Sequence, residues 1–88
     1  MPRYRRKSPK KLGEKMREVR LRLEMTQEEV AKQLGTDSGA ISRYERGLRD
    51  PSLLEILTFS YMSGVGIEVL IDDKRTLAKK TPNRPTKL

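Results

Sequence analysis

The residues from 38 to 48 separate into two faces when they are placed on a helix. One face is polar or small, and it consists of Ser38, Gly39, Ser42, Arg43 and Arg46. The other face is larger and mostly apolar, and we expect it to pack inward. It consists of Ala40, Ile41, Tyr44, Glu45 and Leu48. An arginine can donate two hydrogen bonds to guanine, and serine hydroxyls can reach base edges or phosphates. The polar face therefore suits the major groove of DNA, and an ordinary solvated surface is the alternative interpretation.

Catalytic and metal-binding side chains are scarce in this sequence. The 88 residues include no His and no Cys, which removes the usual general base, the thiolate nucleophile and the commonest metal ligands. Ser and Lys are present, but no pattern places a base, an oxyanion site or a metal beside them. We therefore expect a binding protein without catalytic residues, metal or cofactor, rather than an enzyme.

The net charge of +8 is concentrated at the two ends of the chain. Residues 1–11 hold six Lys or Arg and no acid, and residues 72–88 hold six bases against two acids. The middle, residues 12–71, is net −2. A chain of this length supports one domain. We predict a flexible basic arm at 1–8, one domain at 9–71 and a disordered basic tail at 72–88.

The elements that must hold the polar face are short helices. Ser8 and Pro9 are typical of a helix start, and apolar residues spaced by three and four continue that helix to about Leu23. Thr26 and Glu29 form a capping-box pattern for a second helix, which Gly35 can end.

A third helix can begin after Asp37 and end near residue 46, before Gly47. Residues 26–47 thus read as a helix-turn-helix. Ser52 can cap a fourth helix with a broad inward face that includes Leu53 and Leu57. Residues 67–71 are predicted as a short fifth helix. The predicted fold class is all-α, a compact bundle of about five short helices.

The segment TQEEVAKQLGTDSGAISRYERGLRDPS resembles the helix-turn-helix of the lambda repressor and Cro type, also called XRE-type regulators. The resemblance covers about residues 12–71. It includes a first-helix pattern of Leu12, Met16, Arg17 and Arg20 and a later run of Ile41, Ser42, Tyr44, Glu45 and Gly47. It implies a five-helix bundle whose third helix enters the major groove.

The resemblance also implies roles for individual residues. Base contacts would come from Ser38, Gly39, Ser42 and Arg43. Phosphate contacts would come from Gln27, through its side chain and backbone N–H, and from Arg46 and Arg49. Arg20 and Glu45 match a structural ion pair between the first and third helices, and both lie toward the inward faces of their helices.

Two residues at the start of the third helix depart from the pattern of many relatives. Gly39 has no side chain where relatives often place Gln, so direct readout depends more on Arg43. Asp37 would repel phosphate unless its carboxylate caps the helix, which is the role we expect. Specificity could then depend on DNA shape or on the N-terminal arm. In that arm, Arg3, Arg5 and Arg6 could enter a minor groove or act as an electrostatic tether.

The function expected from these features is sequence-specific binding of double-stranded DNA by a cytoplasmic transcriptional regulator. We expect a repressor that acts as a homodimer on a palindromic operator, because one helix reads few base pairs. The apolar residues left for a dimer contact are Leu54, Tyr61 and Met62, with Val69 or Ile71.

Two other functions remain open from the sequence. One is a protein-interaction module, such as an antitoxin or coactivator, that binds a protein partner through its C-terminal tail. The other is sequence-independent nucleic-acid binding through the basic tails. No apolar run is long enough to span a membrane, so no membrane partner is expected.

Overall fold

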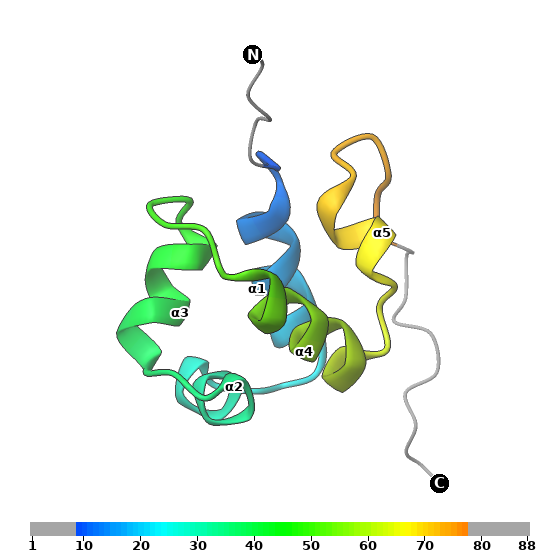
Figure 1. The fold of residues 1–88 in the computed structure, drawn as a ribbon. Helices are drawn as coiled ribbons and strands as arrows, with labels where there is room; N and C mark the ends of the chain where they lie inside the picture. Colours follow the sequence, from blue (N-terminus) through cyan, green and yellow to red (C-terminus); the bar gives the residue numbers. More distant parts are fainter. Residues whose placement is uncertain (1–8, 78–88) are drawn as a thin grey trace, which may run out of the picture.

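The computed structural model describes residues 9–77, and it folds them into helices joined by short turns (Figure 1). The five helices are α1 (Leu12–Arg22), α2 (Gln27–Leu34), α3 (Ser38–Glu45), α4 (Leu53–Ser63) and α5 (Ile67–Ile71). The predicted all-α bundle of short helices is confirmed. The predicted arm, with Arg3, Arg5 and Arg6, and residues 78–88 lie outside the described part. No helix in residues 9–77 is long and apolar enough to cross a bilayer.

Local capping explains where the middle helices begin. The Thr26 hydroxyl accepts the backbone N–H of Glu29 at 3.0 Å, and the Glu29 carboxylate accepts the N–H of Thr26 at 2.8 Å. Ser52 and Glu55 form the same reciprocal pair at the start of α4. Both arrangements satisfy N–H groups that a helix start leaves without partners. These boundaries therefore follow from residues close together in the sequence.

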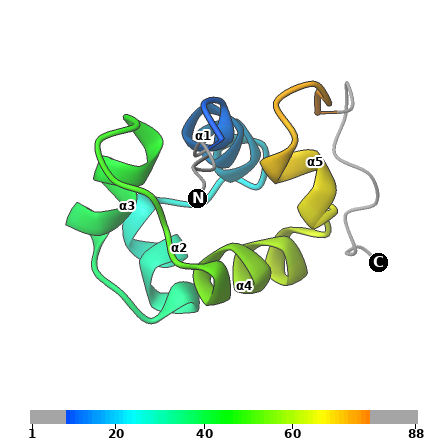
Figure 2. The ribbon, with the colours of Figure 1, turned by 45° about the horizontal axis from the view of Figure 1, so that its top comes forward.

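The helices surround one apolar core. In Figure 2, α1 and α4 lie on opposite sides of the core, and α3 and α5 lie toward its two ends. The largest fully buried side chains come from all five helices, and they are Phe59, Met16, Ile41, Leu70, Val19 and Val30. The predicted apolar stripe of α1 is part of this core. Burial of such side chains supplies most of the stabilisation in a helical domain of this size.

Three leucines that were predicted to face inward are exposed. Leu48 is 64% exposed because α3 ends at Glu45 and the chain turns at Gly47, where φ is +76°. Leu53 and Leu57 are 67% and 46% exposed. The buried side of α4 is narrower than predicted, since it consists of the stripe Ile56, Phe59 and Ser63.

Helix α1 begins at Leu12 rather than at the predicted Ser8–Pro9 start, and its cap comes from the far end of the domain. The two carboxylate oxygens of Asp73 accept the backbone N–H groups of Lys10 and Lys11 at 2.9 and 3.0 Å. Leu77 also packs against the core. The prediction that the disordered tail starts at residue 72 is therefore wrong for residues 72–77, because Asp73 holds the start of α1 and Leu77 has apolar contacts.

A buried lysine completes this connection between the two ends of the domain. Lys15 lies on the apolar side of α1, and only 6% of its surface is exposed. Its Nζ donates to the carbonyl oxygens of Val69 at 2.7 Å and Asp72 at 2.9 Å. These carbonyls belong to the last turn and the end of α5, where a helix lacks internal donors. Lys15 therefore caps α5 while Asp73 caps α1.

The first and third helices approach each other closely at a glycine. A Cβ atom on Gly13 would collide with the carbonyl oxygen of Tyr44, so α1 can pack directly on the backbone at the end of α3. Beside this contact Arg20 donates from Nε and Nη2 to the two oxygens of Glu45, at 2.7 and 3.0 Å. The two side chains are 11% and 3% exposed. The structure thus brings the expected ion pair together in a buried, bidentate form.

We predict that Asp73→Asn lowers the melting temperature at pH 7, because the helix start loses a charged acceptor. Hydrogen bonds from Lys11 and Lys10 lower the pKa of Asp73. The cap therefore contributes above the ordinary carboxyl pKa of about 4 and is lost as pH falls through the lowered value. Thermal unfolding should show a difference in melting temperature between wild type and variant, and this difference should disappear in acid. Asp72→Asn is the control, because the Asp72 carboxylate has nearby partners at Lys74 and Arg75. It should lower the melting temperature less.

We predict that Glu45→Gln lowers the free energy of unfolding by about 3 kcal/mol, because Arg20 is left buried without its counter-charge. Denaturant unfolding measures the change. Glu18→Gln is the matched control, since Glu18 pairs with Arg22 on the exposed side of α1 and such pairs contribute about 0.5 kcal/mol or less. Equal effects of the two substitutions would show that the buried pair has no special role.

Candidate nucleic-acid interface

Helix α3 lies at one end of the molecule (Figure 1), and its exposed side is polar. The side that packs on α1 and α2 is buried, and it consists of Ala40, Ile41, Tyr44 and Glu45. The outer side includes Ser38, Gly39 and Arg43, which are exposed, and Ser42, which is half-buried. The structure therefore brings the four expected base-contacting residues together on one accessible helix face.

Arg43 lies along this face toward the start of α3. A Cβ atom placed on Gly39 would be 3.6 Å from Nη1 of Arg43 and 3.5 Å from Oδ1 of Asp37. The guanidinium group therefore extends back over Gly39, in the direction that helical side chains favour. The missing side chain at Gly39 leaves the space in which the guanidinium lies.

The carboxylate of Asp37 caps the helix that follows it. Its Oδ1 accepts the backbone N–H of Ala40 at 2.8 Å, which makes Asp37 the N-cap of α3. This is the capping role expected from the sequence. Because the carboxylate is engaged and the cationic Arg43 lies near it, the repulsion that Asp37 would exert on a nearby phosphate is reduced.

Gln27 has a partner that the sequence analysis missed. Its side-chain Nε2 donates to Oε1 of Glu45 at 3.0 Å, so the amide joins the Arg20–Glu45 pair. Gln27 is also the first residue of α2, whose N-terminal N–H groups attract anions. The contact fixes the start of α2 beside α3. A phosphate contact through the Gln27 side chain would have to share the amide with Glu45.

Three arginines recur at every third residue through α3 and the turn after it. Arg43, Arg46 and Arg49 are all exposed. Glu45 is the single acid between residues 38 and 49, and it is buried in its ion pair. The exposed charges of this segment are therefore all positive, although residues 9–77 as a whole contain twelve bases and twelve acids. The local order of charges, and not the net charge of the domain, makes this surface cationic.

The turn after α3 is anchored by Tyr44. Its hydroxyl donates to Oε1 of Glu55 at 2.7 Å, and the guanidinium carbon of Arg49 lies 5.7 Å from its ring centroid. Burial and the bond to Glu55 raise the pKa of Tyr44. Burial alone would raise the pKa of Glu55, but the hydrogen bonds from Ser52 and Tyr44 outweigh it and the pKa falls. Arg49, expected at a phosphate, is thus held by an aromatic face.

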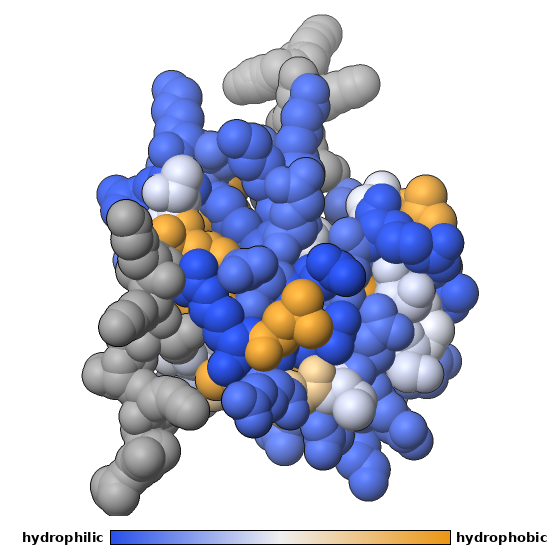
Figure 3. Space-filling model, turned by 180° about the vertical axis from the view of Figure 1, so that it is seen from behind, coloured by the Kyte–Doolittle hydropathy of each residue, from blue (hydrophilic) through white to orange (hydrophobic). Residues whose placement is uncertain are grey.

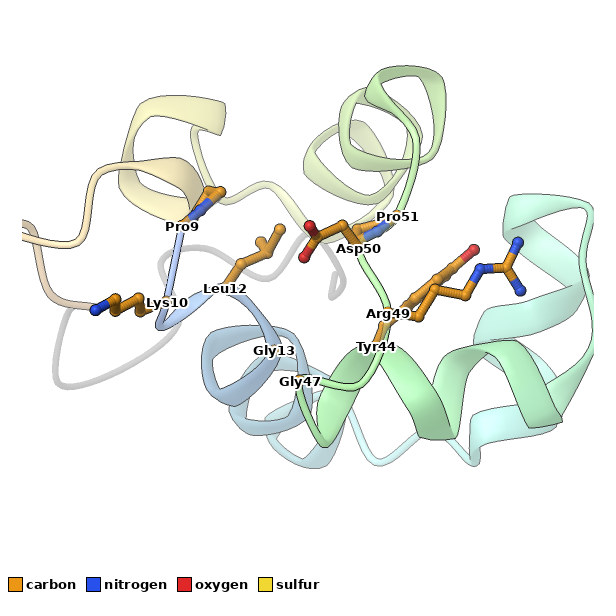
Figure 4. Close-up of a pocket in the computed structure, with 9 residues that line it drawn as sticks. All are labelled: Pro9, Lys10, Leu12, Gly13, Tyr44, Gly47, Arg49, Asp50 and Pro51. Carbon is orange, nitrogen blue, oxygen red and sulfur yellow. The ribbon is translucent and has the colours of Figure 1, made fainter. Parts of the chain in front are cut away.

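A shallow cavity of about 440 Å³ lies between this turn and the start of α1 (Figure 4). It is lined by Pro9, Lys10, Leu12, Gly13, Tyr44, Gly47, Arg49, Asp50 and Pro51. Figure 4 shows Arg49 lying alongside Tyr44 on one wall and Pro9 and Lys10 on the other. The start of the described chain, at Pro9 and Lys10, is therefore next to the turn after α3, which carries Arg46 and Arg49.

Two solved structures of known proteins share this fold. The P22 c2 repressor, determined with a synthetic operator, is 27% identical with a TM-score of 0.67, and the match covers 70% of this chain and 94% of that one. The restriction-modification controller protein C.AhdI from Aeromonas hydrophila is 31% identical with a TM-score of 0.64, again over 70% and 94% of the two chains. The predicted lambda-repressor-like arrangement is therefore confirmed.

Sequence comparison agrees with the structural likeness. The HTH-type transcriptional regulator ImmR of Bacillus subtilis (strain 168) is 33% identical over 69 residues, which are 78% of this chain. The match spans 54% of ImmR, so the chain corresponds to about half of that relative. A helix-turn-helix family model matches residues 16–60 and includes all of α2 and α3. The chain belongs to the Cro/C1-type, or XRE-type, helix-turn-helix family of transcriptional regulators.

Proposed function

We propose that this protein represses transcription by placing α3 in the major groove of a palindromic operator, to which it binds as a homodimer. The observation that carries the proposal is the outer face of α3, where Arg43 lies over Gly39 and is flanked by Ser38 and Ser42. In this arrangement Arg43 reads guanine through O6 and N7, and the two serines contact neighbouring base edges or phosphates.

Phosphate contacts on either side of α3 would set the orientation of the helix. The N-terminus of α2, at Gln27, offers backbone N–H groups and the positive end of a helix dipole. Arg46 and Arg49 offer exposed cations just beyond the other end of α3. Contacts at both ends fix register on the duplex and carry no sequence information themselves.

A homodimer would supply the selectivity that one helix lacks. A single reading helix of eight residues contacts few base pairs, whereas two copies on an inverted repeat double the number of base pairs that are read. The solved complex of the related P22 c2 repressor with a synthetic operator supports the DNA-binding and repressor parts of the proposal.

We predict that Arg43→Ala removes a guanine preference and weakens operator binding by about 1 to 3 kcal/mol. The measurement is selection from a randomised duplex library at one fixed, near-physiological salt concentration, followed by titration of the selected site. Arg75→Ala is the charge-matched control, because Arg75 pairs with Asp72 in the turn after α5. Selection of no motif, with equal and strongly salt-dependent binding by all three proteins, would contradict sequence-specific recognition.

We predict that Gly39→Gln changes the preferred base at one position of each half-site. The longer side chain would occupy the space in which the Arg43 guanidinium lies, so the guanine preference should weaken or move. Gly39→Ala is the control, since its Cβ would make ordinary contacts of 3.5 to 3.7 Å and should leave the motif unchanged. An identical motif for Gly39→Gln and wild type would show that Arg43 does not read bases from this position.

A further inference from the structure

An exposed carboxylate lies at the start of the outer face of α3. Oδ1 of Asp37 accepts the backbone N–H of Ala40 at 2.8 Å, yet the side chain as a whole is exposed. Its other oxygen, Oδ2, accepts no hydrogen bond from residues 9–77. In Figure 3, seen from behind, α3 lies at the right-hand edge, where the surface is mostly hydrophilic or intermediate in hydropathy. The carboxylate thus keeps one acceptor for a molecule outside the protein.

The guanidinium of Arg43 lies beside this carboxylate. A Cβ atom placed on Gly39 would be 3.5 Å from Oδ1 of Asp37, and it would be 3.6 and 3.7 Å from Nη1 and Nη2 of Arg43. Both charged groups therefore lie next to the same point on the helix. Within residues 9–77 no ion pair joins the two side chains. A hydrogen-bond donor and an acceptor are thus placed side by side over Gly39, and each is available to another molecule.

Capping alone does not require a carboxylate at this position. The hydroxyls of Thr26 and Ser52 cap α2 and α4 in the same chain, and Ser, Thr, Asn and Asp are all good N-caps. A negative charge close to the major groove weakens DNA binding, because the phosphates repel it. Asp37 therefore has a cost that an uncharged cap would avoid. A contact that only an acceptor can make would offset this cost.

The major groove of DNA offers partners for both groups. Guanine presents the acceptors O6 and N7, which suit Arg43, whereas cytosine presents an N4 amino donor, which suits a carboxylate. Thymine O4 and guanine O6 would instead place an acceptor against the carboxylate, and the two would repel each other. Successive base pairs are stacked about 3.4 Å apart, so two side chains that lie side by side can reach two neighbouring pairs.

We propose that Asp37 reads a base, and that its Oδ2 accepts the major-groove N4–H of a cytosine in the base pair next to the guanine read by Arg43. This inference rests on the proposed function, since it assigns a second base to the same helix. The bond to Ala40 holds the carboxylate in place before DNA binds, so little conformational entropy is lost when the contact forms. The positive charge of Arg43 offsets that of Asp37 within the groove.

The first test is Asp37→Asn, which has nearly the same shape as the wild type. Asparagine is an equally good cap, and its oxygen must remain on the N–H of Ala40 to serve as one. An NH2 donor then takes the place of Oδ2. In selection from a randomised duplex library, wild type should choose cytosine next to the guanine of Arg43. Asp37→Asn should choose a base with an acceptor there, guanine or thymine, and keep the first guanine.

Two further variants separate the contact from capping and from charge. Asp37→Ser keeps a capping hydroxyl, as Ser52 does at α4, but it has no second acceptor that reaches the groove. It should select the guanine of Arg43 and show no preference at the neighbouring position. Glu28→Gln is the charge-matched control, because Glu28 is an exposed acid in the first turn of α2. It should strengthen binding to all sequences alike and leave the motif unchanged.

A single methyl group on the DNA tests the contact directly. N4-methylcytosine keeps the N4–H that pairs with guanine, and it carries a methyl group in place of the N4–H that faces the major groove. Wild type should bind the selected site about tenfold more weakly when its cytosine is replaced by N4-methylcytosine. Asp37→Ser should bind the two sites equally. A tenfold loss in both proteins would assign the effect to the bulk of the methyl group and overturn the proposal.

The failures of the two proposals are distinguishable. If Asp37→Asn and Asp37→Ser select the wild-type motif, Asp37 is only a cap. If they lose the guanine preference instead, Asp37 acts by positioning Arg43. Either result overturns the base contact of Asp37 and leaves the proposed regulator function standing. A wild type that selects no motif would overturn sequence-specific recognition itself, and the Asp37 contact with it.

Discussion

One buried carboxylate joins the three helices on which the interface depends. Glu45 lies on α3 and accepts hydrogen bonds from Arg20 of α1 and Gln27 of α2. A charge removed from water is tolerated only when its partners are in place, so this contact leaves little freedom in how the three helices lie against one another. The close approach at Gly13 acts in the same direction. The orientation of α3 is thus set from its buried side, through contacts with Arg20, Gln27 and Gly13.

In the eight residues of α3, the side chains that pack against the protein are separate from those that are available to contact DNA. The inward side of α3 makes the ion pair, the apolar contacts and, through Tyr44, the bond to α4. Its outer side has no packing role. The residue types at Ser38, Gly39 and Arg43 can therefore vary with the molecule that they contact and leave the fold unchanged. Substitutions on the outer side should change specificity with small effects on folding, which is how one scaffold can serve many DNA sequences.

Features that depend on neighbours in the chain were predictable from the sequence, and features that depend on distant residues were not. The caps at Thr26, Asp37 and Ser52 and the two faces of α3 are local, because a few adjacent residues determine them. The cap that Asp73 provides to α1 spans more than 60 residues, and no local pattern reveals it. Lys15 gave a weak signal, since it is a charged residue on the apolar side of its helix.

At the candidate interface, too, the sequence predicted local features and missed contacts between distant residues. Which residues of α3 face outward followed from helical periodicity, whereas the bond between Gln27 and Glu45 and the stacking of Arg49 on Tyr44 required the distances between elements. Asp73 and Lys15 also fasten the two ends of the domain to each other. Fraying of either end must therefore break hydrogen bonds at the other, so amide hydrogens near Lys11 and Leu70 should exchange with solvent as one cooperative unit.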